Sequence, residues 1–164
     1  MCSINNMRTI NLTKNLVTIV DDEDYLLFNN YKWYASGRVN IYAVRDILIN
    51  GKKKSIRLHR EILSVKTTNF IVDHINGNTL DNRKSNLRIC LQKENMRNQK
   101  RKSTNTSGFK GVSYRKRDNT WRARIMLDYK EVSLGTFKTK KSAAKAYNDA
   151  ALKLHGKFAK LNEV

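Results

Sequence analysis

The sequence predicts an α+β fold, and three features of its residue pattern support that prediction. Residues 8–65 contain several short, β-like apolar runs. Residues 66–99 follow the order strand, loop, strand, helix. Residues 108–164 contain three alternating segments and then apolar residues at helical spacing. The chain has 164 residues, which is enough for one modest core or two small ones.

Residues 1–65 form the predicted N-terminal β-rich segment. Asn50-Gly51 is expected at the tip of a hairpin, because both residues tolerate the positive φ angles of a tight turn. RLHREIL, at 57–63, is expected to begin a helix or to lead into the next unit. Polar clusters such as VDDEDY separate the β-like runs, which are LVTIV (16–20), YKWYA (31–35) and NIYAVRDILI (40–49).

Residues 66–99 form the second predicted unit. IVDHI, at 71–75, is a predicted strand, and LRIC, at 87–90, is a second one. The segment between them, NGNTLDNRKSN, is a turn-rich loop with its sharpest break at Asn76-Gly77. LQKENMRNQ, at 91–99, is predicted to be a helix.

Residues 100–107, KRKSTNTS, are the predicted basic linker, and residues 108–164 form the third unit. Its helix is expected to begin after Thr139, which can cap it, and to end at Gly156. The apolar face of this helix consists of Ala143, Ala146, Tyr147, Ala150, Ala151 and Leu154. The three strands are predicted in GVSYRKR, TWRARIML and KEVSLGTF.

The middle strand of this unit has two different faces. Trp121, Ala123 and Ile125 lie on one face, which can pack on the Ala-rich helix, and Arg122 and Arg124 lie on the other. A sheet surface with Arg side chains can enter the major groove of DNA and bind guanine edges bidentately.

The net charge predicts a polyanionic partner. Lys and Arg number 33 against 14 Asp and Glu, a net charge of +19, which indicates nucleic acid or an anionic membrane surface. No apolar run is long enough to span a bilayer, and the N-terminus has no signal-peptide core. We therefore expect no membrane partner and a cytoplasmic location, the host cytoplasm if a phage encodes the protein. Cys2 and Cys90 have no second Cys nearby, so neither a CxxC zinc site nor a disulfide framework is expected.

The second unit contains residues suited to phosphodiester hydrolysis. A His of near-neutral pKa can take a proton from water. A divalent cation held by carboxylate and amide oxygens can neutralise charge on the phosphate and the leaving oxygen. Asp81 and Asn82 are interpreted as loop-forming residues, His59 as a packed structural residue and His155 as a surface residue.

The pattern DHINGN…DN…SNLRIC…ENMRN resembles the HNH nucleases, in the H-N-N form found among phage and intron homing endonucleases. Their ββα-metal fold matches the strand, loop, strand, helix order. The resemblance implies that His74 is the general base and that Asn86 orients it through its side-chain oxygen. It also implies that Asp73 and Asn95 hold one Mg²⁺ or Mn²⁺ ion, with Asn98 as a rival ligand. The Cys residues of zinc-stabilised members are missing.

The third unit resembles the plant Apetala-type, ethylene-response-factor DNA-binding domain. The residues that carry the resemblance include Gly111-Val112, Trp121, Leu134-Gly135-Thr136-Phe137, Ala143-Ala144, Ala146-Tyr147, Ala150-Ala151 and Leu161-Asn162. In that family the sheet docks in the major groove. The resemblance implies contacts from Arg115 and Arg124, and position alone adds Lys110, Arg117 and Arg122.

Three contact positions depart from the plant pattern: Ser113 and Glu131 stand for Arg, and Ser133 stands for Trp. The plant target sequence is therefore not expected to transfer to this chain. Lys100, Arg101 and Lys102 of the linker are expected to contact DNA phosphates between the two modules without distinguishing sequence.

The sequence thus predicts a site-specific, homing-type endonuclease that acts on double-stranded DNA. One chain carries one such site, so a monomer would nick one strand. We expect a monomer rather than a dimer, with no obligate protein partner. The alternative is a sequence-specific DNA-binding transcriptional regulator with an inactive nuclease core. A third hypothesis, a basic RNA- or ribosome-binding protein, explains the charge but neither motif.

Overall fold

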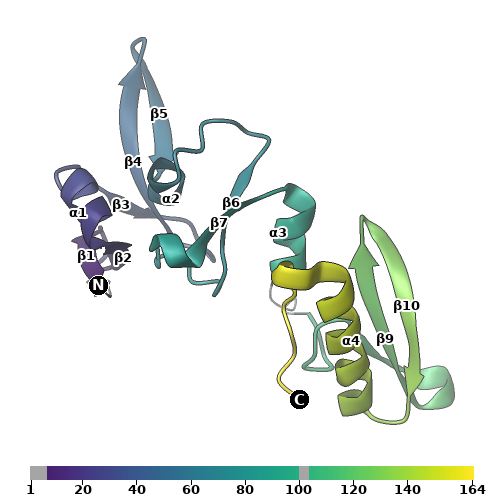
Figure 1. Ribbon diagram of the computed structural model, residues 1–164. Coiled ribbons are helices and arrows are strands. Elements are labelled where there is room, and N and C mark those ends of the chain that lie inside the picture. The colour runs from purple at the N-terminus through teal and green to yellow at the C-terminus, as the bar shows by residue number, and fades with distance from the viewer. Residues whose placement is uncertain (1–6, 100–103) are drawn as a thin grey trace, which may run out of the picture. The chain divides into compact units, whose positions relative to one another are not determined.

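The protein consists of two compact units, Met1–Cys90 and Leu91–Val164. A computed structural model describes residues 7–99 and 104–164. Strands and helices occur in both units (Figure 1), which confirms the predicted α+β class. No helix among the described residues is long and apolar enough to cross a membrane.

In the N-terminal unit, residues 7–90 form three small antiparallel sheets and two short helices. The helices are α1 (Asp22–Phe28) and α2 (Leu58–Ile62), and a 3₁₀ turn, η1, spans Lys84–Asn86. The first sheet pairs β1 (Met7–Asn11) with β2 (Val17–Asp21). The second has the order β3 (Tyr34–Ser36), β4 (Tyr42–Ile49), β5 (Lys52–Arg57), and the third pairs β6 (Ile71–His74) with β7 (Leu87–Cys90).

One hydrophobic core joins these sheets. A single cluster of buried residues contains Val20 of β2, Leu58 of α2, Val72 of β6, Leu87 of β7 and also Trp33, which lies just before β3. The predicted boundary after residue 65 therefore lies within a single core, which positions β6 and β7 against the N-terminal strands.

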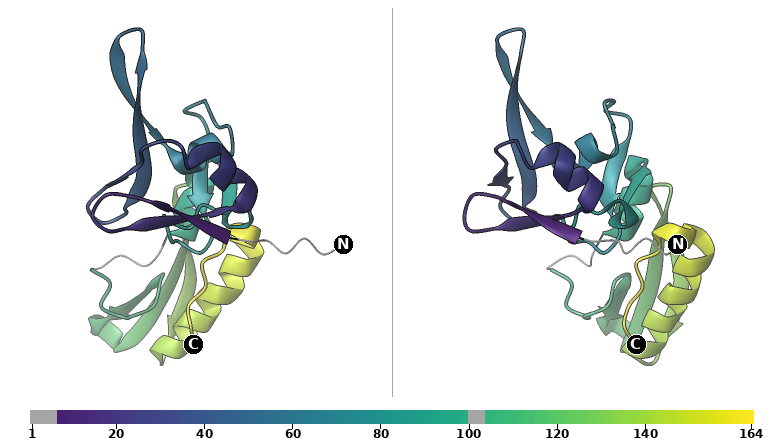
Figure 2. Two further views of the ribbon diagram at one scale, coloured as in Figure 1. Left: turned by 90° about the vertical axis from the view of Figure 1, so that its left-hand side faces the viewer. Right: turned by 60° about the vertical axis from the view of Figure 1, so that its left-hand side comes forward.

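Two local features of this unit follow from residue type. Asn50 and Gly51 have φ angles of 50° and 73°, so they form the predicted turn between β4 and β5. That hairpin projects from the rest of the unit (Figures 1 and 2). The cluster VDDEDY, expected only to separate strands, instead contains the start of α1. Its acidic residues lie in the first helical turn, where they interact favourably with the helix dipole.

The C-terminal unit contains a three-stranded antiparallel sheet packed on one long helix. The sheet has the order β10 (Lys130–Phe137), β9 (Thr120–Leu127), β8 (Val112–Arg115). Helix α4 (Lys140–His155) lies along it (Figure 2). Thr139 caps α4 by accepting a hydrogen bond from the Ser142 N–H at 3.1 Å, as predicted. Ala143, Ala144 and Ala151 are fully buried, so the helix backbone can approach the sheet closely.

Helix α3 (Gln92–Asn98) belongs to the C-terminal unit, although the sequence analysis groups it with the nuclease strands. The Lys110 ammonium donates hydrogen bonds to the carbonyl oxygens of Arg97 and Gln99, each at 2.6 Å. Arg97 and Lys93 also pair with Asp128, at 3.2 and 3.3 Å. A cation at these C-terminal carbonyls complements the helix dipole, so Lys110 holds α3 in this unit.

Gly111 is expected to be indispensable for the stability of the C-terminal unit. Its φ is +74°, and a Cβ there would overlap the ring of Tyr147. Gly111→Ala should therefore lower the free energy of unfolding by about 2–4 kcal/mol, from backbone strain and overpacking together. The matched control is Gly108→Ala: φ is +83° but no atom lies within 4 Å. Denaturant unfolding should show a loss of only about 1 kcal/mol for the control. Equal losses would contradict the packing argument.

Candidate active site and nucleic-acid interface

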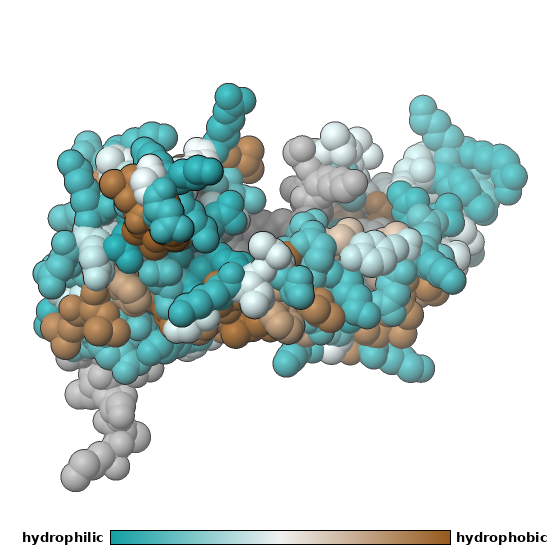
Figure 3. All heavy atoms as spheres, turned by 90° about the horizontal axis from the view of Figure 1, so that it is seen from above, coloured by the Kyte–Doolittle hydropathy of each residue, from teal (hydrophilic) through white to brown (hydrophobic). Residues whose placement is uncertain are grey.

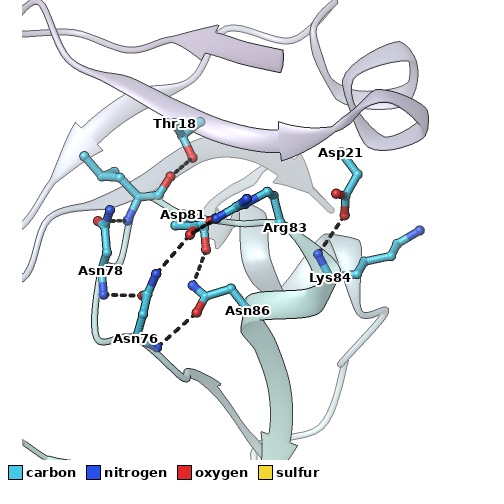
Figure 4. Close-up of polar contacts among 9 residues, drawn as sticks. Thr18, Asp21, Asn76, Asn78, Asp81, Arg83, Lys84 and Asn86 are labelled. Carbon is cyan, nitrogen blue, oxygen red and sulfur yellow. Dashed lines mark hydrogen bonds and ion pairs between the residues drawn. The ribbon is translucent and has the colours of Figure 1, made fainter. Parts of the chain in front are cut away.

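The loop between β6 and β7 is held in shape by the side chain of Asn86. Its Oδ1 accepts a hydrogen bond from the backbone N–H of Asn76 at 3.0 Å, and its Nδ2 donates to the carbonyl of Asp81 at 2.8 Å (Figure 4). Asn86 is 7% exposed. It therefore ties together two distant points of the loop backbone, at the point where β7 begins.

Asp81 is the second anchor of this loop. Its carboxylate accepts hydrogen bonds from Asn76 Nδ2 at 3.0 Å and from Arg83 Nε and Nη2 at 2.8 and 2.7 Å (Figure 4). The hydrogen bonds from Arg83 lower the pKa of Asp81, although burial opposes them. The carboxylate thus stays ionised and the loop stays closed.

His74 lies at the end of β6 and is only 4% exposed. Its Nε2 is 3.0 Å from Oδ1 of Asn82. The Nδ2 of Asn82 donates to the hydroxyl of Thr18 at 2.6 Å, and Thr18 donates to the carbonyl of Leu80 at 2.9 Å. Thr18 and Asn82 are fully buried, so the imidazole is connected to β2 by polar groups shielded from water.

A second histidine packs against His74. The rings of His59 and His74 are perpendicular, with centroids 5.0 Å apart, and the ring of Tyr42 lies 5.4 Å from His59. Burial lowers the pKa of His59 to about 3, with smaller contributions from His74, Arg57 and Arg60. Burial also lowers the pKa of His74. Both imidazoles are therefore neutral near neutral pH. His59 is packed, as the sequence analysis predicts, but it packs on the candidate base.

Asp73 faces Arg88 across the β6–β7 pair, where the two residues are direct partners in register. The Nε and Nη2 atoms of Arg88 donate to the same oxygen, Oδ2, at 2.9 and 2.7 Å. The Asp73 side chain is 8% exposed and that of Arg88 is 13% exposed. Any cation at Asp73 must therefore share its carboxylate with a buried guanidinium.

The structure corrects the role expected for Asn86. The oxygen of Asn86 accepts from the backbone of Asn76, and the amide oxygen at His74 belongs to Asn82. Asn82, interpreted above as a loop former, is therefore the side chain that contacts the candidate base. The cause is the direction of the side chains: Asn86 points across the loop, whereas Asn82 points inward between His74 and Thr18.

Asn95, the second expected ligand, lies on α3 in the C-terminal unit, and its backbone N–H donates to the carbonyl of Leu91 at 3.0 Å. The carboxylate of Asp73 and the amide oxygen of Asn95 are each of a chemical type that suits a hard cation such as Mg²⁺ or Mn²⁺. Within the described ranges 7–99 and 104–164, no group of three or more His, Cys, Asp or Glu residues could hold a metal ion.

The exposed face of the C-terminal sheet carries the predicted Arg residues, but an acidic side chain joins two of them. Glu131 accepts hydrogen bonds from Arg122 Nη2 and Arg124 Nη1, each at 2.7 Å, through its two separate oxygens. Their side chains are 39% and 46% exposed. The carboxylate thus fixes both guanidinium groups and offsets part of their charge.

The other predicted DNA contacts differ in their settings. Arg115 pairs with Asp118 on the same turn, and Arg117 is exposed. Lys110 is not available as predicted, because its ammonium is bound to the end of α3; burial and the charge of Lys160 lower its pKa to about 8. Lys100, Arg101 and Lys102 lie outside the described residues.

Hydrophilic residues cover most of the molecular face in Figure 3.

His155 is a further correction. It is 6% exposed rather than a surface residue, and its Nε2 lies 2.8 Å from the carbonyl oxygen of Met126. Three residues that contact the candidate site, Thr18, Asn82 and Arg88, were not predicted as site residues from the sequence, where they had weak signals at most. Arg88 could have been found as the cross-strand neighbour of Asp73, since LRIC and IVDH were both predicted as strands.

Comparison with protein families identifies both modules. A family described as HNH endonuclease matches residues 65–97, and a family described as AP2 domain matches residues 107–157. The first range contains the β6–β7 site and α3 except for its last residue, and the second contains the sheet and α4. No solved structure matches the chain.

Three curated proteins show related sequences. Protein 3.8 of Escherichia phage T7 is 36% identical over 91 residues, which cover 56% of this chain and 74% of that protein. A protein of Acanthamoeba polyphaga mimivirus, named uncharacterized HNH endonuclease L560, is 29% identical over 156 residues, covering 92% and 77%. An AP2/ERF and B3 domain-containing transcription factor of Arabidopsis thaliana is 43% identical over 51 residues, covering 31% and 14%.

Acid should destabilise the N-terminal unit through His59. The pKa of His59 falls from 6.5 to about 3 on folding, so the unfolded chain binds more protons between those values. Stability from the neutral ring is complete above pH 6.5 and is lost as the pH falls toward 3. Between about pH 7.5 and about pH 5, the free energy of unfolding should fall by about 2 kcal/mol more in the native chain than in His59→Phe.

The measurement is denaturant unfolding followed by tryptophan fluorescence in a Trp121→Phe background, so that Trp33 reports on the N-terminal unit. An identical pH dependence in both chains would show that His59 is not kept neutral by the fold.

Proposed function

Because the chain belongs to the HNH endonuclease family and carries a C-terminal AP2 domain, we propose that it is a homing-type endonuclease that hydrolyses a phosphodiester bond of double-stranded DNA. The observation that carries this proposal is the setting of His74. It lies at the end of β6 beside Asp73, and Asn82 contacts its Nε2 at 3.0 Å. A neutral imidazole held in one orientation is the arrangement that general-base catalysis requires.

In this proposal His74 takes a proton from the attacking water. Burial keeps the imidazole neutral near neutral pH, because it lowers the pKa of His74. Asn86 supports the site indirectly by closing the loop that carries Asn82. Asn82 therefore takes the orienting role that the family resemblance assigned to Asn86.

Asp73 and Asn95 are the proposed ligands of one Mg²⁺ or Mn²⁺ ion, and the oxygen chemistry of both side chains fits either cation. When bound, such an ion supplies positive charge to the phosphate and the leaving oxygen. Arg88 remains beside Asp73 as a second cation, and its two hydrogen bonds orient the carboxylate toward β7.

The C-terminal sheet is proposed to bind DNA beside the cleavage site and to provide site choice. Arg122 and Arg124 lie on its exposed face, where they can contact base edges or phosphates. Linking this module to the nuclease raises the effective concentration of DNA at the active site. Since one chain carries one proposed active site, a monomer is proposed to nick one strand.

A second candidate function is a DNA-binding transcriptional regulator with an inactive nuclease core. The observation in its favour is the buried ion pair between Asp73 and Arg88, in which one carboxylate oxygen accepts both guanidinium hydrogen bonds. An inactive core needs no metal at that position. The two functions differ in cleavage but share DNA binding.

The nuclease proposal predicts that His74→Ala abolishes cutting and leaves DNA affinity nearly unchanged, because His74 is buried in the N-terminal unit and its proposed role is chemical. The assay uses supercoiled plasmids with phage and host genomic inserts, with Mg²⁺, with Mn²⁺ and with EDTA. Nicked circles that require metal and His74 are expected. Linear product would indicate paired action. Salt-sensitive binding without cutting in the native chain would favour the regulator.

Glu131 is predicted to control selectivity, because it holds Arg122 and Arg124 in one arrangement. Glu131→Gln should tighten binding to unrelated DNA. It should also lower the ratio of specific to non-specific affinity about 10-fold, within the range for one bidentate base contact. Glu163→Gln is the matched control, since it changes net charge equally at an exposed position. Titrations on cognate and unrelated duplexes at several salt concentrations make the comparison. Equal effects of the two variants would show that only net charge matters.

A further inference from the structure

The hydrogen bonds between Leu80 and His74 have a direction that chemistry dictates. The carbonyl oxygen of Leu80 can only accept, so Thr18 must donate its hydroxyl hydrogen to it, at 2.9 Å. The Thr18 oxygen then accepts from Asn82, and the Asn82 atom at 2.6 Å must be Nδ2. Consequently the Asn82 atom that faces His74 Nε2, at 3.0 Å, is the oxygen Oδ1.

The reverse orientation of Asn82 is disfavoured by burial. A rotated amide would place Oδ1 against a hydroxyl oxygen whose hydrogen is already donated to Leu80. Thr18 and Asn82 are both fully buried, so water cannot compensate for the lost partner. An unsatisfied buried polar group is costly, and the amide therefore keeps one orientation.

Backbone pairing holds Thr18 against the loop. The N–H of Ile19 donates to the carbonyl of Leu80, and the N–H of Asn82 donates to the carbonyl of Ile19, each at 2.8 Å. The N–H of Lys84 donates to the carboxylate of Asp21, also at 2.8 Å (Figure 4). Strand β2 thus runs along the loop from Thr18 to Asp21.

We infer that Thr18 is a positioning residue for the nuclease reaction: acting through Asn82, it fixes the His74 tautomer that carries hydrogen on Nε2 and the lone pair on Nδ1. The inference deepens the proposed function and rests on it. Thr18 lies outside residues 65–97, which match the HNH family. A strand of the N-terminal segment thereby becomes part of the catalytic apparatus.

The assignment selects the atom that accepts the proton. His74 Nδ1 takes a proton from water, the water oxygen bonds to phosphorus, and the bond from phosphorus to the leaving oxygen breaks. The leaving oxygen is protonated from solvent, and the imidazolium later returns its proton to solvent. Throughout the step, the Nε2 hydrogen stays bonded to Asn82 Oδ1, whose partial negative charge stabilises the imidazolium.

The tautomer can be measured without any cleavage. The chain has three histidines, His59, His74 and His155, so ¹⁵N-histidine labelling gives three ring systems that variants can assign. In the full-length native chain, two-dimensional long-range ¹H–¹⁵N spectra should show His74 as the Nε2–H form. The Nδ1–H form would overturn the inference, and this part of the test needs no variant at position 18.

Two matched variants then test Thr18 itself. Thr18→Val keeps the shape and loses the hydroxyl, and Thr18→Ser keeps the hydroxyl and loses the methyl group. Thr18→Val should mix the two His74 tautomers and slow single-turnover cutting about 10- to 100-fold, as loss of an outer-shell partner does elsewhere. Thr18→Ser should rescue both readouts.

The remaining outcomes separate the inference from the proposed function. If Thr18→Val leaves tautomer and cutting rate as in the native chain, or if Thr18→Ser is as impaired as Thr18→Val, the positioning role is wrong. A third outcome is that the native chain shows the expected tautomer and cuts no DNA, while Thr18→Val changes the His74 spectrum. The nuclease proposal then fails, and the control of the His74 tautomer by Thr18 stands.

Discussion

The pairing of the β6–β7 loop with strand β2 is the constraint on which the candidate active site depends. Ile19 forms two hydrogen bonds with the loop backbone: its N–H donates to Leu80, and its carbonyl accepts from Asn82. This pairing buries Asn82 completely and places it between Thr18 and His74. A loop of Asn, Asp and Gly residues would otherwise have many conformations of similar energy. The N-terminal segment therefore acts as the frame for residues that the family pattern assigns to the loop alone.

The same unit combines two buried imidazole rings with two carboxylates that each pair with a guanidinium group. His59 and His74 pack ring against ring, and burial lowers the pKa of each. Asp73 and Asp81 remain paired with Arg88 and Arg83. Each carboxylate is oriented by a guanidinium, since a buried charge without a partner is strongly unfavourable.

The C-terminal unit uses its basic residues in two different ways. Arg122 and Arg124 stay at the surface, where Glu131 holds them side by side. Lys110 instead binds the carbonyl groups that end α3. Helix α3, which carries Asn95, is therefore a structural part of the unit that contains the AP2 domain. A DNA contact was predicted from the sequence for all three of these cations, and their neighbours in the structure made the difference.

The sequence by itself determined most of the strands, the long helix, the β4–β5 turn, the two-faced β9 and the presence of Asp73 and His74 at a strand end. These features depend on local periodicity and on turn chemistry, which neighbouring residues specify. Only the tertiary structure decided that Asn82 rather than Asn86 contacts the His74 ring, that Arg88 pairs with the Asp73 carboxylate, and that Lys110 binds the carbonyl groups at the end of α3. The physical reason is the range of the contacts: Asn82 is oriented by Thr18, 64 positions away, and no local pattern records which way a loop amide points.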